Sequence, residues 1–320
     1  MKRGLLAVLF CLFWIAPTPV AAAGAEFTVT PNTTGSSAAG YYQYRLQPQT
    51  QTTLTATIHN TAAATQRFNV NIIDAGVSSS GQLLYTPGAN LTATTGPTLA
   101  SMATPLKQTV SVAAHASKTV QVTLRVPQTS WYGERLGALS VAAIPAAGKQ
   151  SGLQNRFVLA TPLHLTIAHV DESRPKLTLS NTKLSQRNVT ADLASHTARL
   201  FGGITIHSTL QNSAKQTLAS ATIKNAQMAP NAIMPLRLPV TKALTAGTYT
   251  LVIDLTSGKQ HYHLTDHFTI TAAQASRTDM AQPAVALAWW VYALIGLVIS
   301  LLGVIGWLLW QQRRAKHDAN

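Results

Sequence analysis

Cysteine is nearly absent from this 320-residue chain, in which Cys11 is the single example. Cys11 lies in an N-terminal segment that we expect to be removed, so the rest of the chain can form neither a disulfide nor a thiolate site. Exported domains that lack disulfides need a hydrophobic core of their own. Two domains of roughly 100 to 150 residues each would supply such a core.

Acidic residues are also scarce, because 10 Asp and Glu stand against 24 Lys and Arg and give a net charge of +14. A glycosidase needs a pair of carboxylates, and these few scattered acids offer no pair to nominate. Between residues 26 and 283 the basic residues are spread singly rather than grouped as in a nucleic-acid-binding arm, so no nucleic-acid partner is predicted. Dispersed positive charge favours attraction to an anionic cell envelope, with simple solubility as the alternative.

Catalytic and metal-binding motifs are equally lacking. No G-x-S-x-G occurs, and the S-x-x-K match at 173–176 contains Pro175, which disfavours the helical turn that this motif needs. One expected strand carries three histidines on the same face: His261, His263 and His267. We interpret this face as an exposed polar surface rather than as a zinc site. We predict no catalytic residue, no metal and no cofactor, and expect a binding protein rather than an enzyme.

One long apolar run, residues 284–310, contains no charged residue and exceeds the roughly 20 residues that a transmembrane helix needs. A polar stalk over 274–283 precedes it, and a basic tail over 311–320 follows it. Tryptophans near both ends of the run and basic residues after it are typical of the aromatic belts and cytoplasmic flank of a membrane helix. The predicted anchor residues are Trp289, Trp290, Trp307, Trp310, Arg313, Arg314 and Lys316.

The N-terminal residues 1–25 have the order of a secretory signal peptide: basic residues, a short apolar run and then small residues. We expect cleavage after Ala23 or Ala25. With the C-terminal helix, this predicts a single-pass type I protein of the cell membrane, whose mature N-terminus is extracellular and whose C-terminus is cytoplasmic.

The segment between these ends alternates apolar and polar residues in several short runs, clearest at 52–60, 67–74 and 119–126. Each run predicts a half-buried strand, and many such strands with turns between them favour β-sandwiches. A charged, proline-containing break at 171–175 separates two domains, 26–171 and 175–273. The predicted fold class is therefore all-β, with two tandem Ig-like β-sandwich domains plus one C-terminal transmembrane helix.

Two regions of these domains suggest accessible surfaces. The first domain carries an insert, residues 75–107, which is rich in Ser, Gly, Thr and Pro, and loops this long are usually functional or mobile. In the second domain, Pro235 and Pro239 predict a protected edge strand. The strands expected at 247–255 and 203–211 are then candidates for an open edge to which a partner strand could add.

The chain resembles the WxL-interacting protein family of Gram-positive bacteria in its order of segments and in short stretches of sequence. The similar stretches include 40–42, 51–60 and 112–127 in the first domain, and 228–231 and 247–251 in the second. The resemblance implies a peptidoglycan-binding-type domain followed by a host-binding-type domain. The partners it implies are peptidoglycan or other anionic wall polymers, WxL-domain surface proteins and host matrix proteins.

Candidate contact residues follow from chemistry and from this resemblance. Tyr41, Trp131 and Tyr132 are candidate glycan contacts, because aromatic rings at strand ends can stack on sugars, although packing at the end of the sandwich would also explain them. Met228 and Asn231 are candidate protein contacts within the stretch that resembles the family. We expect a membrane-anchored extracellular protein that attaches to the cell wall and to surface proteins. A cell-wall hydrolase and a secretion chaperone are the alternatives.

Overall fold

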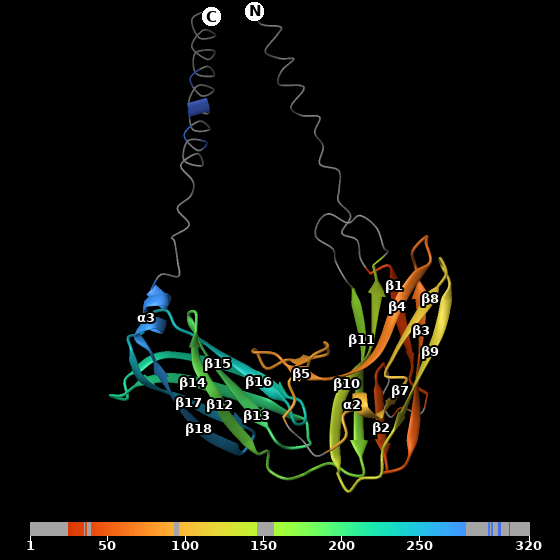
Figure 1. Cartoon of the computed structure of the whole chain (residues 1–320), viewed down its shortest axis with the longest axis horizontal. Coiled ribbons are helices and arrows are strands. Elements are labelled where there is room, and N and C mark those ends of the chain that lie inside the picture. Colours follow the sequence, from red (N-terminus) through yellow and green to blue (C-terminus); the bar gives the residue numbers. More distant parts are fainter. Residues whose placement is uncertain are drawn as a thin grey trace, which may run out of the picture.

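The computed structural model describes residues 25–34, 36, 40–92, 96–145 and 157–279, with Leu294, Gly296, Ser300, Leu301 and Trp307. Within these residues the chain forms two β-sandwiches that lie beside each other (Figure 1). The all-β sandwich architecture predicted from the sequence is confirmed.

The first sandwich packs a four-stranded sheet on a five-stranded sheet. In spatial order, the smaller sheet contains β1 (Phe27–Asn32), β3 (Gln51–Asn60), β9 (Ser117–Arg125) and β7 (Ala103–Thr104). The larger contains β2 (Tyr42–Leu46), β11 (Val158–Ile167), β10 (Gly133–Ile144), β4 (Gln66–Asp74) and β8 (Lys107–Val112). Strand β2 runs parallel to β11, whereas the other neighbouring strands of both sheets are antiparallel.

The second sandwich packs a three-stranded sheet on a four-stranded sheet. In spatial order, the smaller sheet contains β12 (Leu177–Ser185), β13 (Asn188–Ser195) and β16 (Ile233–Pro239). The larger contains β15 (Thr217–Met228), β14 (Phe201–Asn212), β17 (Gly247–Ser257) and β18 (Gln260–Ile270). Helix α3 (Ala272–Asp279) follows and covers the first part of the segment predicted as a stalk.

Alternating sequence explains most of these strands. In β3, Leu54, Ala56 and Ile58 are fully buried, and the threonines between them lie on the outer face. Successive side chains of a strand point to opposite faces, so this pattern places one face in the core. Strand β10 departs from the pattern, since its first ten residues are all buried. Its Leu139 packs in the core of the first sandwich, whereas its Leu136 joins the core of the second.

The predicted order of edge strands in the second sandwich is wrong in one respect. The strands at 247–255 and 203–211 belong to β17 and β14, which are the two inner strands of the four-stranded sheet. The edges of that sheet are β15 and β18. Alternation identifies a strand but not its neighbours, because the order of strands depends on long-range pairing. The strand that contains Pro235 and Pro239, β16, does lie at an edge as predicted.

The insert at 75–107 is part of the structural core rather than a free loop. It forms β5 (Gly76–Val77), β6 (Leu83–Leu84), α2 (Leu99–Met102) and β7. Figure 1 shows β5 between the two sandwiches. Ala75 and Val77 are buried in the core of the second sandwich, whereas Leu99 and Met102 are buried in that of the first. The insert therefore joins the two domains.

The predicted signal peptide and most of the predicted membrane anchor lie outside the described residues. Of the anchor residues, Trp307 alone is described, and its backbone is helical and its side chain 57% exposed. No helix in the described part of the chain has the length and apolar character needed to cross a bilayer.

Candidate functional site

A buried arginine lies where the two sandwiches meet. Arg135, in β10, is 3% exposed. Its Nε donates to the Pro97 carbonyl (2.7 Å), its Nη1 donates to Asn231 Oδ1 (2.8 Å), and its guanidinium lies 4.1 Å from the Trp131 ring centroid. Burial lowers the pKa of Arg135 to about 10, and the nearby Asp74 carboxylate opposes this shift. The charge is therefore held by partners within the chain.

The preceding residue, Glu134, makes a second link between the sandwiches. Its Oε1 lies 2.9 Å from His164 Nε2, its Oε2 accepts from the Leu200 N–H (2.7 Å), and its own N–H donates to the Ala198 carbonyl (2.7 Å). Burial raises the pKa of Glu134, but the hydrogen bonds from His164 and Leu200 outweigh burial, so its pKa is lower than usual. Because Ala198 and Leu200 precede β14, the bonds of Glu134 with these two residues connect the first sandwich to the second.

The stretch at 228–231, predicted to contact partner proteins, is part of the same junction. Met228 is fully buried and Asn231 is 5% exposed. The Asn231 carbonyl accepts from the Thr92 N–H (2.7 Å), and the Ile233 N–H donates to the Asn90 carbonyl (2.9 Å), so the insert is bonded to the start of β16. In this structure both side chains are buried and make intramolecular contacts at the junction, and their contact with a partner protein stays a prediction.

The aromatic candidates for glycan contact do not form one site. Tyr41 is 37% exposed just before β2, and its hydroxyl donates to Gln43 Oε1 (3.2 Å). Tyr132 is 42% exposed and stacks on His169, with ring centroids 4.1 Å apart. Trp131 is half-buried beneath Arg135. Tyr41 precedes the residue of β2 that pairs with Leu163, whereas Tyr132 precedes the residue of β10 that pairs with Ile167, so the two rings lie at different levels along β11.

The histidines of β18 lie on the exposed face of the larger sheet of the second sandwich. His263 Nδ1 lies 2.7 Å from Asp254 Oδ1, and His267 Nδ1 lies 2.9 Å from Thr250 Oγ1. The pairing of β17 with β18 brings Asp254 opposite His263, a contact that alternation within β18 could not predict. Among the residues that the structure describes, no group of three or more His, Cys, Asp or Glu is arranged to hold a metal ion.

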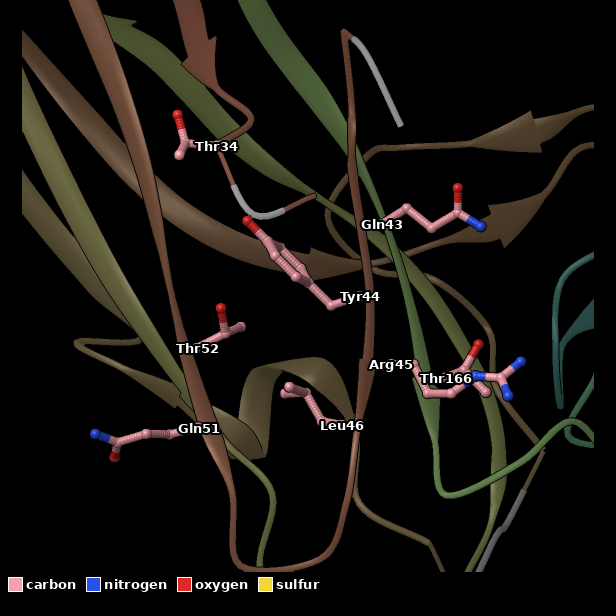
Figure 2. Close-up of a pocket in the computed structure, with 8 residues that line it drawn as sticks. All are labelled: Thr34, Gln43, Tyr44, Arg45, Leu46, Gln51, Thr52 and Thr166. Carbon is pink, nitrogen blue, oxygen red and sulfur yellow. The ribbon is translucent and has the colours of Figure 1, made fainter. Parts of the chain in front are cut away.

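A cavity of about 600 Å³ opens between β2 and β3 of the first sandwich (Figure 2). Its lining combines hydroxyl and amide groups with one cation, one phenol and one aliphatic side chain, and contains no acidic residue. The lining residues are Thr34, Gln43, Tyr44, Arg45, Leu46, Gln51, Thr52 and Thr166. Burial raises the pKa of Tyr44, and a hydrogen bond with Thr52 partly opposes this shift. Such a lining can bind a neutral or anionic ligand rich in hydrogen-bonding groups.

This cavity does not follow from any local pattern in the sequence. Tyr44 lies two residues after Tyr42 on the same face of β2, and both side chains are buried and stacked, with ring centroids 6.5 Å apart. The cavity residues outside β2 come from β3, β11 and the segment after β1, which approach β2 only in the folded chain. Within β2, the alternation of Tyr44 and Arg45 predicts one buried and one exposed side chain, and this is the only feature of the cavity that local sequence indicates.

Several solved structures resemble the fold at low sequence identity. The class 5 fimbriae chaperone CfaA matches with 11% identity and a TM-score of 0.29, covering 75% of this chain and 98% of that chain. The E. coli chaperone DraB matches with 13% identity and a TM-score of 0.28, covering 77% of this chain and 98% of that chain. A PapD-like domain of human CEP192 matches with 11% identity and a TM-score of 0.27, covering 49% and 95%.

Comparison with curated proteins finds no match. Comparison with protein families gives two consecutive matches. Residues 27–143 match the peptidoglycan binding domain of the WxL Interacting Protein, and residues 148–279 match its host binding domain. Both families are binding domains, and they support a binding role at the cell surface. Because the two matches together cover most of the chain in the order that the family has, the chain belongs to the WxL-interacting protein family.

Proposed function

We propose that the protein is a membrane-anchored extracellular binding protein that attaches to the cell wall through its first sandwich and to surface proteins through its second. The observation that carries this proposal is the pair of family matches, peptidoglycan-binding at 27–143 and host-binding at 148–279. Its wall partners are peptidoglycan or other anionic polymers. Its protein partners are WxL-domain surface proteins, with host matrix proteins as a further class.

The chemistry of the first sandwich supports attachment to the wall. The whole chain, of which this sandwich is part, has a net charge of +14, which favours association with an anionic envelope. The cavity beside β2 supplies hydroxyl and amide groups that suit an uncharged or acidic polymer. The exposed rings of Tyr41 and Tyr132 supply flat apolar surfaces beside strands of the same sheet.

The edges of the second sandwich support contact with proteins. The insert bonds to residues beside β16, and the Gln227 N–H near the end of β15 donates to the Gly81 carbonyl (2.8 Å). The β18 edge is contacted by the Arg174 guanidinium, which donates to the His261 carbonyl. The first half of β15 is therefore the best candidate for an edge to which a partner strand adds.

We further propose the topology that the sequence predicts, with a cleaved signal peptide, a membrane helix at 284–310 and a cytoplasmic tail. Protease treatment of intact cells should remove an epitope at Thr33 and spare one at Asn320. Equal digestion of both epitopes would contradict this topology.

The experiment that tests the function is a pull-down with the full chain against isolated cell walls and detergent-extracted surface proteins. We expect wall fragments and a WxL-domain protein in the bound fraction. A dye-release assay on labelled walls serves as the second arm, because a cell-wall hydrolase would release dye and a binding protein would not. A bound fraction that contains neither wall fragments nor a surface protein would contradict the proposed function.

A further inference from the structure

Strand β2 leaves part of its backbone unpaired. It lies at the edge of the five-stranded sheet and pairs only with β11, in parallel. In a parallel strand, alternate residues direct both backbone groups toward the same neighbour. The Leu46 carbonyl accepts from the Ala168 N–H (2.8 Å) on the β11 side, so Gln43 and Arg45 direct their N–H and C=O toward the free edge.

The free edge is open only at Arg45. Before it, the Gln43 N–H donates to Ser36 Oγ (2.8 Å). After it, the Gln47 N–H donates to Thr50 Oγ1 (3.1 Å), and the Thr50 N–H donates to the Gln47 carbonyl (3.1 Å). In the part of the chain that the structure describes, the Arg45 N–H and C=O make no hydrogen bond on this side. The gap accommodates a short peptide but not a long strand.

The cavity beside β2 follows this open edge. Figure 2 shows Tyr44 and Leu46 on one side of β2 and Arg45 on the other, beside Thr166. A peptide that pairs with an edge strand places alternate side chains on the two faces of the sheet. The cavity offers space on both faces, and its volume of about 600 Å³ falls within the range of ligand sites.

We propose that the Arg45 edge and this cavity bind the short peptide of peptidoglycan in an extended conformation. This inference rests on the proposed wall-binding function and assigns the contact to the peptide rather than to the sugar. A peptide supplies, along one continuous backbone, the N–H and C=O groups that can pair with those of Arg45, whereas the amide groups of N-acetylated sugars are isolated substituents of the ring. Arg45 is the single charged residue of the lining, and a guanidinium pairs well with a peptide carboxylate.

Substitutions at the edge test this assignment. Arg45→Pro removes the free N–H, and proline is tolerated where an edge N–H faces solvent. Arg45→Ala removes only the guanidinium. Gln51→Trp fills the cavity from β3, at an exposed position. The matched control is Arg67→Ala, which removes an exposed arginine from β4, away from the cavity lining. Each variant is first checked for cooperative melting, and if Arg45→Pro fails this check, Gln51→Trp decides.

The probes are a muropeptide (the disaccharide with its short peptide), the same peptide without sugar, and the disaccharide alone, each titrated calorimetrically into the full chain. We expect the muropeptide and the free peptide to bind with similar Kd and the disaccharide to bind at least about tenfold more weakly. Arg45→Pro should weaken peptide binding by about tenfold, corresponding to one or two hydrogen bonds, and Gln51→Trp should weaken it by about tenfold because the new ring occupies the cavity. Arg67→Ala should leave peptide binding unchanged.

The inference would be overturned by tight binding of the disaccharide alone or by absence of peptide binding. It would also be overturned if Arg45→Pro and Gln51→Trp both bound the peptide with wild-type affinity. Sedimentation with intact peptidoglycan sacculi separates this failure from failure of the proposed function. If the chain sediments with sacculi but Arg45→Pro and Gln51→Trp bind peptide like the wild type, only the proposed peptide site is rejected. If the chain does not sediment with sacculi, the proposed wall-binding function itself is rejected.

Discussion

Arg135 of the first sandwich donates a 2.8 Å hydrogen bond from Nη1 to Oδ1 of Asn231 in the second, and both side chains are buried. The two residues are far apart in sequence, and each has further partners at the junction. A buried charge that loses its partner is costly, so this contact resists separation of the domains. The two sandwiches are therefore expected to behave as one body.

Asn231→Ala should reveal the contribution of this bond. Asn231 has a φ of 53°, in the left-handed region where a residue such as alanine costs roughly 1–2 kcal/mol. The loss of a hydrogen bond from a charged group adds about 1.5–3 kcal/mol to the destabilisation. The measurement is the free energy of unfolding in urea.

The matched control is Asn225→Ala, because Asn225 also has a φ of 53° but an exposed side chain. Asn225→Ala should show only the cost of the left-handed backbone. Equal destabilisation by the two substitutions would mean that the Arg135–Asn231 bond contributes nothing measurable.

The shared core predicts that both sandwiches unfold in one transition. Ala75 and Val77 of the insert, and Leu136 of β10, are buried in the core of the second sandwich. Unfolding either sandwich would expose these residues to water. Calorimetry of the full chain should show a single peak, whose calorimetric and van't Hoff enthalpies agree. Two resolved peaks would show that the domains are independent.

Gly81→Ala should loosen the insert from the second sandwich. Gly81 has a φ of 75°, and a Cβ there would lie 2.3 Å from the Ala226 Cβ. Gly88 has a similar φ of 89°, and a Cβ there would meet nothing within 4 Å. Both substitutions carry the backbone cost of roughly 1–2 kcal/mol, and only Gly81→Ala adds a steric clash.

Thermal melting of the two glycine variants should therefore give a clearly lower Tm for Gly81→Ala than for Gly88→Ala. Hydrogen exchange at residues 76–84 should also rise in the former. If the two variants melt alike, the close packing of the insert against β15 is not a stabilising contact.

Glu134 predicts a pH dependence of stability. Its pKa in the folded protein is lower than the ordinary value of 4.5, so folding favours the ionised form. The resulting stabilisation is fully present above about pH 4.5 and is lost as the pH falls through the lower folded-state pKa. Glu134→Gln should cost roughly 1–3 kcal/mol at pH 7, and this deficit should shrink in acid. Urea unfolding at pH 3, 5 and 7 measures it, and a deficit that does not change with pH would contradict this account.

The sequence was sufficient to predict what depends on local alternation. The strands at 52–60 and 67–74, and the buried positions of Leu54 and Ile58 within them, follow from a period of two. The excess of Lys and Arg over Asp and Glu also follows from composition. These features indicate sandwiches and a binding role without reference to contacts between distant residues.

What the sequence did not predict depends on pairing between distant segments. The order of β14, β15, β17 and β18 determines which strands lie at edges, and alternation is the same in inner and edge strands. The apolar residues of the insert are too sparse to show a period, so its place in two cores was missed. Likewise, β11 falls within the host-binding match, although it pairs with β2 and β10 of the first sandwich.

The central claim is that this protein binds the cell wall specifically, and the most direct measurement is co-sedimentation of the full chain with purified peptidoglycan sacculi at rising salt. At 1 M salt the Debye length falls to about 3 Å, so attraction based on net charge is screened. The account predicts that a saturable bound fraction persists at 1 M salt on sacculi stripped of anionic polymers. Complete release at 1 M salt would contradict it and leave only non-specific adsorption of a basic protein.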